Sequence, residues 1–166
     1  MDTEETILLV DSDDRPLAPG LRSAAVLQMS WRRTSGGVVV DDGLKWVLCH
    51  RRALTKDERP GLWVATFGGK SKAGEEPLAT AKRELNEEFG LDLDSTSLLH
   101  RGKYRSDDRR QFEHLYVVKV DRIMYTIVPD RNEVDDFAWI PIHEVLEKIG
   151  NDPLWYNYGY ERFLLE

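Results

Sequence analysis

The chain has 166 residues, of which 41% are hydrophobic and 32% charged, and its formal net charge is −7. This length and balance are those of an ordinary globular protein with a sizeable core, so we expect residues 1–166 to form a single domain. The acidic balance argues against broad non-specific nucleic-acid binding, which depends on many Lys and Arg contacts to phosphates. A small anionic ligand stays compatible with it, because metal cations or a local group of basic residues can bind one.

The chain contains no apolar run near the roughly 20 residues that span a bilayer, and residues 1–5 lack the basic and apolar regions of a secretion signal. We therefore expect a cytoplasmic protein without a membrane anchor. The single cysteine, Cys49, excludes an internal disulfide and a cysteine-based metal cluster, and its apolar surroundings favour a buried thiol. The sequence is compatible with a homodimer but does not fix the oligomeric state.

The first part of the chain favours short strands separated by turns. Expected here are a strand at 6–10, a turn at 11–14, a short helix near 22–28, strands at 37–40 and 44–50, a loop at 51–61 and a strand at 62–67. The segment Asp41-Asp42-Gly43 indicates a hairpin turn. The pair Gly68-Gly69 is expected to end the last of these strands.

A helix is predicted over residues 77–89, with Pro77 in its first turn and Gly90 at its end. Later in the chain we expect strands at 97–104, 111–120 and 137–140, and helices at 143–149 and 155–165. Strands and helices in this mixed order indicate an α/β or α+β sandwich rather than a regular βαβ repeat.

The predicted helix at 77–89 carries three glutamates close together. Glu84 and Glu88 are four residues apart and share one face, with Glu87 beside them. Three neighbouring carboxylates repel one another unless a cation is present, and their oxygens suit a hard ion such as Mg²⁺ or Mn²⁺. Taken by itself, the helix fits a solvated acidic face as well as a metal site, since acidic surface helices are common.

The sequence around this helix favours the metal site. The segment Gly69-x5-Glu75-x7-Arg83-Glu84-Leu85-x-Glu87-Glu88-x-Gly90-Leu91 resembles the Nudix box at every defined position. The resemblance implies the Nudix fold, an α/β/α sandwich with a mixed β-sheet. It also implies that Glu84, Glu87 and Glu88 bind Mg²⁺ or Mn²⁺, with the Gly68 carbonyl as a further ligand.

The same resemblance implies roles for residues beside the metal ligands. Arg83 is expected to pair with a carboxylate of the box and hold it in place, and Glu75 to pack back against the box. The general base differs among members of the family, so Glu84 and Glu87 are both candidates. Glu133 is a third, because residues 132–139 resemble the loop that often supplies a carboxylate from outside the box.

Residues 50–63 resemble the isopentenyl-diphosphate isomerase branch of the Nudix superfamily and its hydrolase relatives. This likeness implies that Arg51, Arg52 and Lys56 contact substrate phosphates. The isomerase chemistry is poorly supported, because Gly68 and Lys70 stand where the isomerases carry a catalytic cysteine and a metal-binding histidine. No histidine precedes His50, although the isomerases use histidines from this part of the chain.

The sequence therefore predicts a divalent-metal-dependent hydrolase. Its substrate is expected to be a small molecule with a diphosphate linkage, either a nucleoside diphosphate derivative or a similar organic diphosphate. Two alternatives stay open: an isopentenyl-diphosphate isomerase, and a non-catalytic ligand-binding module on the same fold.

Overall fold

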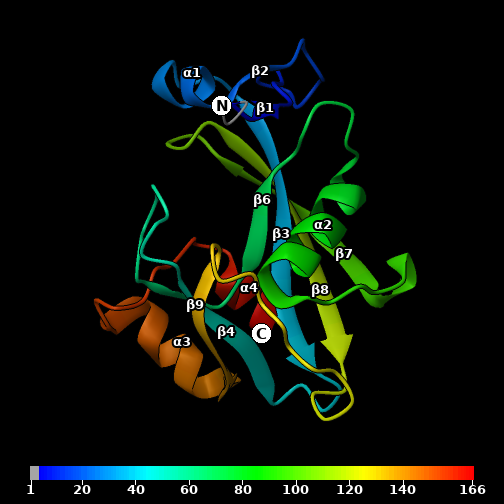
Figure 1. Ribbon diagram of the computed structural model, residues 1–166, viewed down its shortest axis with the longest axis vertical. Coiled ribbons are helices and arrows are strands. Elements are labelled where there is room, and N and C mark those ends of the chain that lie inside the picture. The colour runs from blue at the N-terminus through cyan, green and yellow to red at the C-terminus, as the bar shows by residue number, and fades with distance from the viewer. Residues whose placement is uncertain (1–3) are drawn as a thin grey trace.

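The computed structural model describes residues 4–166 (Figure 1). Residues 1–3 lie outside this part, and with them most of the acidic N-terminus considered above. The strands are β1 (Thr6–Ile7), β2 (Gly20–Leu21), β3 (Arg32–Asp41), β4 (Trp46–Arg52), β5 (Trp63–Val64), β6 (Phe67–Lys70), β7 (Leu98–Ser106), β8 (Gln111–Val120) and β9 (Val134–Pro141). The helices are α1 (Arg22–Leu27), α2 (Pro77–Phe89), the 3₁₀ turn η1 (Ser95–Ser97), α3 (Ile142–Asn151) and α4 (Glu161–Leu165). Among these described helices, none has the length and apolar character needed to cross a membrane.

The described residues form a mixed sheet of seven strands. Its central path is β5-β4-β3-β8-β7, with β6 paired to β3 and β9 paired to β4. Strands β3 and β8 are parallel over their whole length, whereas the other pairs are antiparallel. The long strand β3 is therefore shared by three partners, and it is the element around which the sheet is built.

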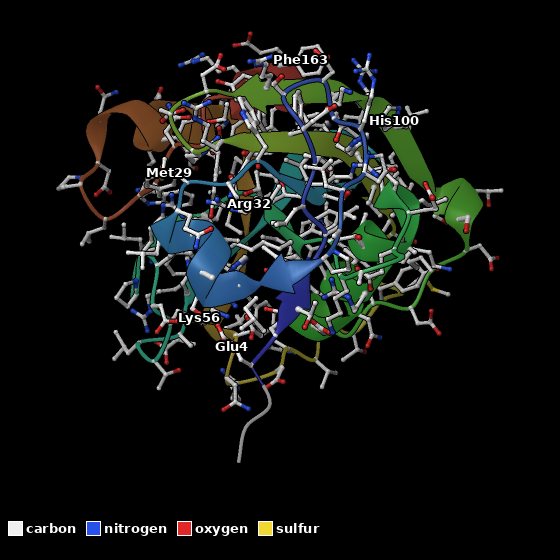
Figure 2. The ribbon with its side chains drawn as sticks, turned by 90° about the horizontal axis from the view of Figure 1, so that it is seen from above. Glu4, Met29, Arg32, Lys56, His100 and Phe163 are labelled. Carbon is white, nitrogen blue, oxygen red and sulfur yellow. The ribbon has the colours of Figure 1, made fainter. Side chains whose placement is uncertain are left out.

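Helices cover both faces of this sheet. Along β3 successive side chains point to opposite faces, so Val39 packs with α2 whereas Val38 and Val40 pack with α3 and α4. Figure 1 shows α2 lying along β3 and β6, and α3 beside β4 and β9. In Figure 2, Phe163 of α4 and Lys56 lie on opposite sides of the molecule. These layers confirm the predicted α/β/α sandwich with a mixed sheet.

Two glycines allow the strands around β3 to come close together. A Cβ on Gly37 would lie 1.8 Å from the Tyr116 carbonyl oxygen of β8, and one on Gly36 would lie 2.0 Å from the Phe67 carbonyl oxygen of β6. Main-chain atoms on both sides thus fill the space that a side chain would need. This close approach fixes β6 and its glycines beneath α2.

Helix α2 begins and ends where the sequence predicts. Pro77 occupies the first turn, where an N–H group would have no acceptor within the helix, so the N–H that proline lacks is not needed. Gly90 ends the helix in the left-handed conformation, with φ 68°, and its N–H donates to the Asn86 carbonyl at 2.7 Å. Strand β8 also has its predicted bounds.

Several predicted elements are wrong in part, and the expected strand at 6–10 extends only over Thr6–Ile7. Residues 62–67 form two short strands rather than one, and Gly68-Gly69 lies inside β6 because it pairs with Ser35 and Gly36 of β3. Strand β3 begins five residues before the expected start at residue 37, where its polar residues pair with β8.

The last predicted helix is shorter than expected, because α4 begins only at Glu161. The buried Glu161 carboxylate accepts hydrogen bonds from the backbone N–H groups of Tyr158, Gly159 and Tyr160. These bonds hold the residues before α4 in a turn, so they cannot continue the helix backward.

Candidate active site

A cleft of about 200 Å³ lies beside α2 and carries most of the predicted site residues. Helix α2 supplies Arg83, Glu84, Glu87 and Glu88 to its wall. The other charged residues that line it are Glu5, Arg22, Arg52, Lys56, Glu58, Arg59, Lys70, Lys72, Glu113 and Glu133. Acidic and basic groups thus line the same small space, which suits a ligand that carries both a metal cation and phosphate oxygens.

Glu84, Glu87 and Glu88 of α2 form the acidic wall of the cleft. Arg83 binds two of these carboxylates and that of Glu75. Its Nε donates to Glu75 Oε1 at 2.8 Å, and its Nη1 donates to Glu84 Oε1 at 2.6 Å and to Glu87 Oε2 at 3.2 Å. Its Nη2 donates to the Lys70 carbonyl at 3.0 Å and so ties α2 to β6. The contacts expected for Arg83 and Glu75 are therefore present, and they hold the box carboxylates in a defined arrangement.

The Arg83–Glu75 pair should make the free energy of unfolding depend on pH in the acid range. Hydrogen bonds from Arg83 are the main reason that the pKa of Glu75 lies at about 2, below its usual 4.5. Because the folded-state pKa is depressed, this contribution is fully present above pH 4.5 and is lost as the pH falls towards 2. We expect Arg83→Met to lower the free energy of unfolding at pH 7 by about 2 kcal/mol and to weaken this acid dependence.

Urea denaturation at pH 7 and pH 3 measures both effects. Arg162→Met is the matched control, because within residues 4–166 Arg162 pairs only with the exposed Glu166 and the Leu146 carbonyl. If Arg83→Met and the wild type lost equal stability between the two pH values, the Arg83–Glu75 contact would not be the source of the dependence.

Glu88 differs from the other carboxylates because it is buried. Its side chain is 5% exposed, and its Oε2 atom has no hydrogen-bond partner among the described residues. Burial, together with the nearby charge of Glu84, raises the pKa of Glu88 well above its usual value. Burial likewise raises the pKa of Glu84. These groups are costly to ionise here unless a cation offsets their charge.

The residues present fit a hard divalent cation. The donors are carboxylate oxygens, and the unpartnered Glu88 oxygen is a buried polar atom that requires a partner. Within residues 4–166, no three His, Cys, Asp or Glu side chains stand in a ready-made metal-binding arrangement. Arg83 forms ion pairs with the Glu84 and Glu87 carboxylates. Metal binding by Glu84, Glu87, Glu88 and the Gly68 carbonyl stays a prediction.

The glycine pair of β6 makes room for the carboxylates. A Cβ on Gly69 would lie 2.2 Å from Glu84 Oε1, so only glycine lets this carboxylate lie against the strand. Gly68 lines the cleft with φ 148°, a conformation that residues with side chains rarely adopt. Both glycines thus shape the site: Gly69 leaves room for the Glu84 carboxylate, and Gly68 adopts the backbone conformation found beside the cleft.

Glu133 lines the same cleft as the α2 glutamates, together with two of the predicted phosphate-binding residues. Its Oε2 accepts a hydrogen bond from Lys56 Nζ at 2.6 Å, and Arg52 lines the same space while its Nε donates to the Glu58 carbonyl at 2.9 Å. These three residues come from β4 and two loops. The fold therefore brings together residues that are distant in sequence.

Arg51 is not brought to the cleft. Its Nη2 lies 2.6 Å from Asp135 Oδ2, and it is absent from the residues that line the cavity. Successive side chains of β4 point to opposite sides, so Arg52 reaches the cleft and Arg51 does not. A role for Arg51 in phosphate binding stays an expectation without structural support.

Two cleft cations were not singled out from the sequence as binding residues. Lys70 projects from β6 with its side chain 12% exposed, and Arg59 lies against the Tyr156 ring at 4.0 Å. Both share the Glu58 carboxylate, at 3.5 Å and 3.1 Å respectively. A lysine beside the glycine pair is a usable signal for Lys70, whereas Arg59 reaches the site only through the folding of its loop.

Comparison with known proteins identifies the family. The family described as NUDIX domain matches residues 31–162. The isopentenyl-diphosphate Delta-isomerase of Burkholderia multivorans is 29% identical over 96% of this chain and 93% of its own length. The uncharacterized Nudix hydrolase YfcD of Salmonella typhi is 37% identical over 52% of this chain and 47% of its own length.

Among solved structures, the DR0079 protein of Deinococcus radiodurans has the same fold. It is 20% identical, covers 97% of both chains and superposes with a TM-score of 0.76. At this identity the likeness supports the fold alone. The match over residues 31–162 includes the whole box and the cleft residues from β4 to Tyr158, and it shows that this chain belongs to the Nudix family.

Proposed function

We propose that this protein hydrolyses a diphosphate linkage in a nucleoside diphosphate derivative or a similar organic diphosphate, with Mg²⁺ or Mn²⁺ as cofactor. The observation that carries the proposal is that Glu84, Glu87 and Glu88 line one cleft together with Arg52, Lys56 and Lys70. The carboxylates would hold the cation, and the basic side chains would bind the oxygens of the diphosphate.

Different residues of the cleft would carry out different parts of the hydrolysis. A bound divalent cation would offset charge on the diphosphate and lower the pKa of a water molecule. Lys56 and Lys70 would orient the phosphoryl groups, and Arg83 would keep Glu84 and Glu87 in place. The carboxylates of Glu84, Glu87 and Glu133 all line the cleft and are the candidates for the base that takes the proton from water. The pH profiles of their single Gln variants would assign it.

Isomerisation of isopentenyl diphosphate is the second candidate, because a relative that matches nearly the whole chain is named an isomerase. That reaction protonates a carbon–carbon double bond and needs an acid in the cleft. Gly68 and Lys70 stand at the positions of the isomerase cysteine and histidine. The only thiol of the chain, Cys49, is fully buried in the core on the other face of the sheet. We therefore favour hydrolysis.

One experiment separates the two reactions. The protein is incubated in D₂O with a panel of organic diphosphates, including isopentenyl diphosphate, and with Mg²⁺ or Mn²⁺, and the products are identified by mass. Hydrolysis predicts monophosphate products from at least one compound and no deuterium in recovered isopentenyl diphosphate. Deuterium uptake without phosphate release would establish the isomerase instead. Tight binding without any product would indicate a binding module.

The role of Lys70 can be tested by substitution. If its ammonium group binds a phosphate oxygen, Lys70→Met should raise KM by about 10-fold or more, since a charged hydrogen bond contributes about 1.5–3 kcal/mol. The value of kcat should change much less, because Lys70 has no part in activating water. Steady-state kinetics measures both, with Lys82→Met as the control, since Lys82 lies on α2 outside the cleft lining. An unchanged KM would remove Lys70 from the binding site.

A further inference from the structure

His50 is a buried polar residue for which the proposed reaction has no role. It lies on β4, is 1% exposed, and sets the edge of its ring against Phe89 of α2, with centroids 5.3 Å apart at an interplanar angle of 79°. Neither ring nitrogen has a hydrogen-bond partner among the described residues. Buried polar groups without partners are rare in folded proteins, so this ring calls for an explanation.

A second unpartnered atom lies beside the ring. The Nε2 atom of His50 is 3.9 Å from Oε2 of Glu88, which is the carboxylate oxygen that lacks a partner. This distance is too long for a hydrogen bond, but a small rotation of the Glu88 side chain would close it. Both groups come from elements whose positions are fixed, because β4 lies inside the sheet and α2 packs on its face.

The ring of His50 is enclosed and lies against the apolar side chain of Phe89. A neutral imidazole carries one N–H and can donate a single hydrogen bond. An aliphatic residue such as Leu would fill the same apolar space beside Phe89 and leave no polar nitrogen unsatisfied. A polar contact is therefore the better explanation for an imidazole here, and Glu88 is the unpartnered polar group that it faces.

We propose that His50 is a positioning residue for the metal site: its Nε2–H donates to Oε2 of Glu88 and thereby directs the other carboxylate oxygen towards the divalent cation. The inference rests on the proposed function in one respect, that Glu88 is a metal ligand. Hydrogen bonds of this kind fix the orientation of ligating side chains, and their loss commonly weakens metal binding by 10–100-fold.

Two variants of His50 separate a donor from a space-filling residue. His50→Leu removes the hydrogen bond, and His50→Gln keeps an N–H donor of similar reach. We expect His50→Leu to weaken Mn²⁺ binding by about 10–100-fold, measured by electron paramagnetic resonance titration without substrate. In the metal-free protein the same variant should show an unchanged or higher Tm, because the unsatisfied nitrogens are gone. His50→Gln should bind Mn²⁺ within about 5-fold of the wild type, since the donor is kept.

The matched control is His100→Leu, which removes an exposed histidine on β7 outside the cleft and should leave Mn²⁺ binding unchanged. Nitrogen NMR of the wild type adds a measurement without any variant. The proton of His50 should reside on Nε2, and its resonance should shift when Mg²⁺ is added.

Each contrary result has a distinct meaning. Equal Mn²⁺ affinity in His50→Leu and the wild type would overturn the positioning role while leaving the proposed function intact. An equal loss in His50→Gln and His50→Leu would overturn the role of the N–H donor. If the wild type bound no Mn²⁺, or if Glu88→Gln bound it equally well, the metal site itself would fail and the inference with it.

Discussion

Glu88→Gln is expected to lower kcat/KM for Mg²⁺-dependent hydrolysis by about 100-fold or more. The amide has the shape of the carboxyl group but lacks its negative charge, so it binds a hard cation poorly. The fold should tolerate the change well, because Glu88 is buried and its charge is costly there. Steady-state kinetics at several Mg²⁺ concentrations provides the measurement, and Glu76→Gln is the control, since Glu76 is exposed at the start of the same helix.

The stability of this variant supplies an independent check. Burial raises the pKa of Glu88 in the folded state, so without metal the wild type should lose stability as the pH rises above the unfolded value of 4.5. Glu88→Gln should lack this loss and be at least as stable as the wild type at neutral pH. Activity within 10-fold of the wild type, or a destabilised fold, would contradict the role given to Glu88.

Gly37→Ala is expected to lower the free energy of unfolding by about 3 kcal/mol or more. The new Cβ would lie 1.8 Å from the Tyr116 carbonyl oxygen, and this main-chain atom cannot move aside as a flexible side chain can. Strands β3 and β8 would have to separate, although their parallel pairing extends over ten residues of each strand. Urea denaturation followed by circular dichroism measures the loss.

The control for this prediction is Gly150→Ala near the end of α3. No atom lies within 4 Å of a Cβ built there, and Ala favours a helix over Gly, so this variant should be more stable by about 0.5–1 kcal/mol. A loss of less than 1 kcal/mol in Gly37→Ala would mean that the sheet relaxes more easily than its packing indicates.

The sequence predicts an element well where every local signal agrees. Helix α2 has Pro77, an apolar stripe and Gly90, each favouring the same bounds. Strand β8 is likewise predicted with its observed bounds. Gly68-Gly69 is misjudged because glycine usually interrupts a strand, whereas here a main-chain neighbour favours it: a Cβ on Gly68 would lie 2.7 Å from the Ser35 carbonyl oxygen.

The acidic wall of the site is readable from the sequence because all of its carboxylates lie within one helix and its preceding loop. The rest of the cleft lining is not, since Arg59, Lys70 and Glu133 come from three separate segments that only the fold brings together. Arg51 and Arg52 illustrate the difficulty. Two identical neighbouring side chains have different surroundings because they point to opposite sides of β4.

The parallel pairing of β3 with β8 has a consequence for how the protein folds. These strands are far apart in the chain, and α2 lies in the segment between them. Closing so long a loop is entropically costly and slow, and an isolated helix of 13 residues is marginal in water. The glutamates therefore gain their mutual geometry only once the sheet has closed. A divalent cation should accordingly slow unfolding, because it binds the native state, and leave the rate of refolding nearly unchanged.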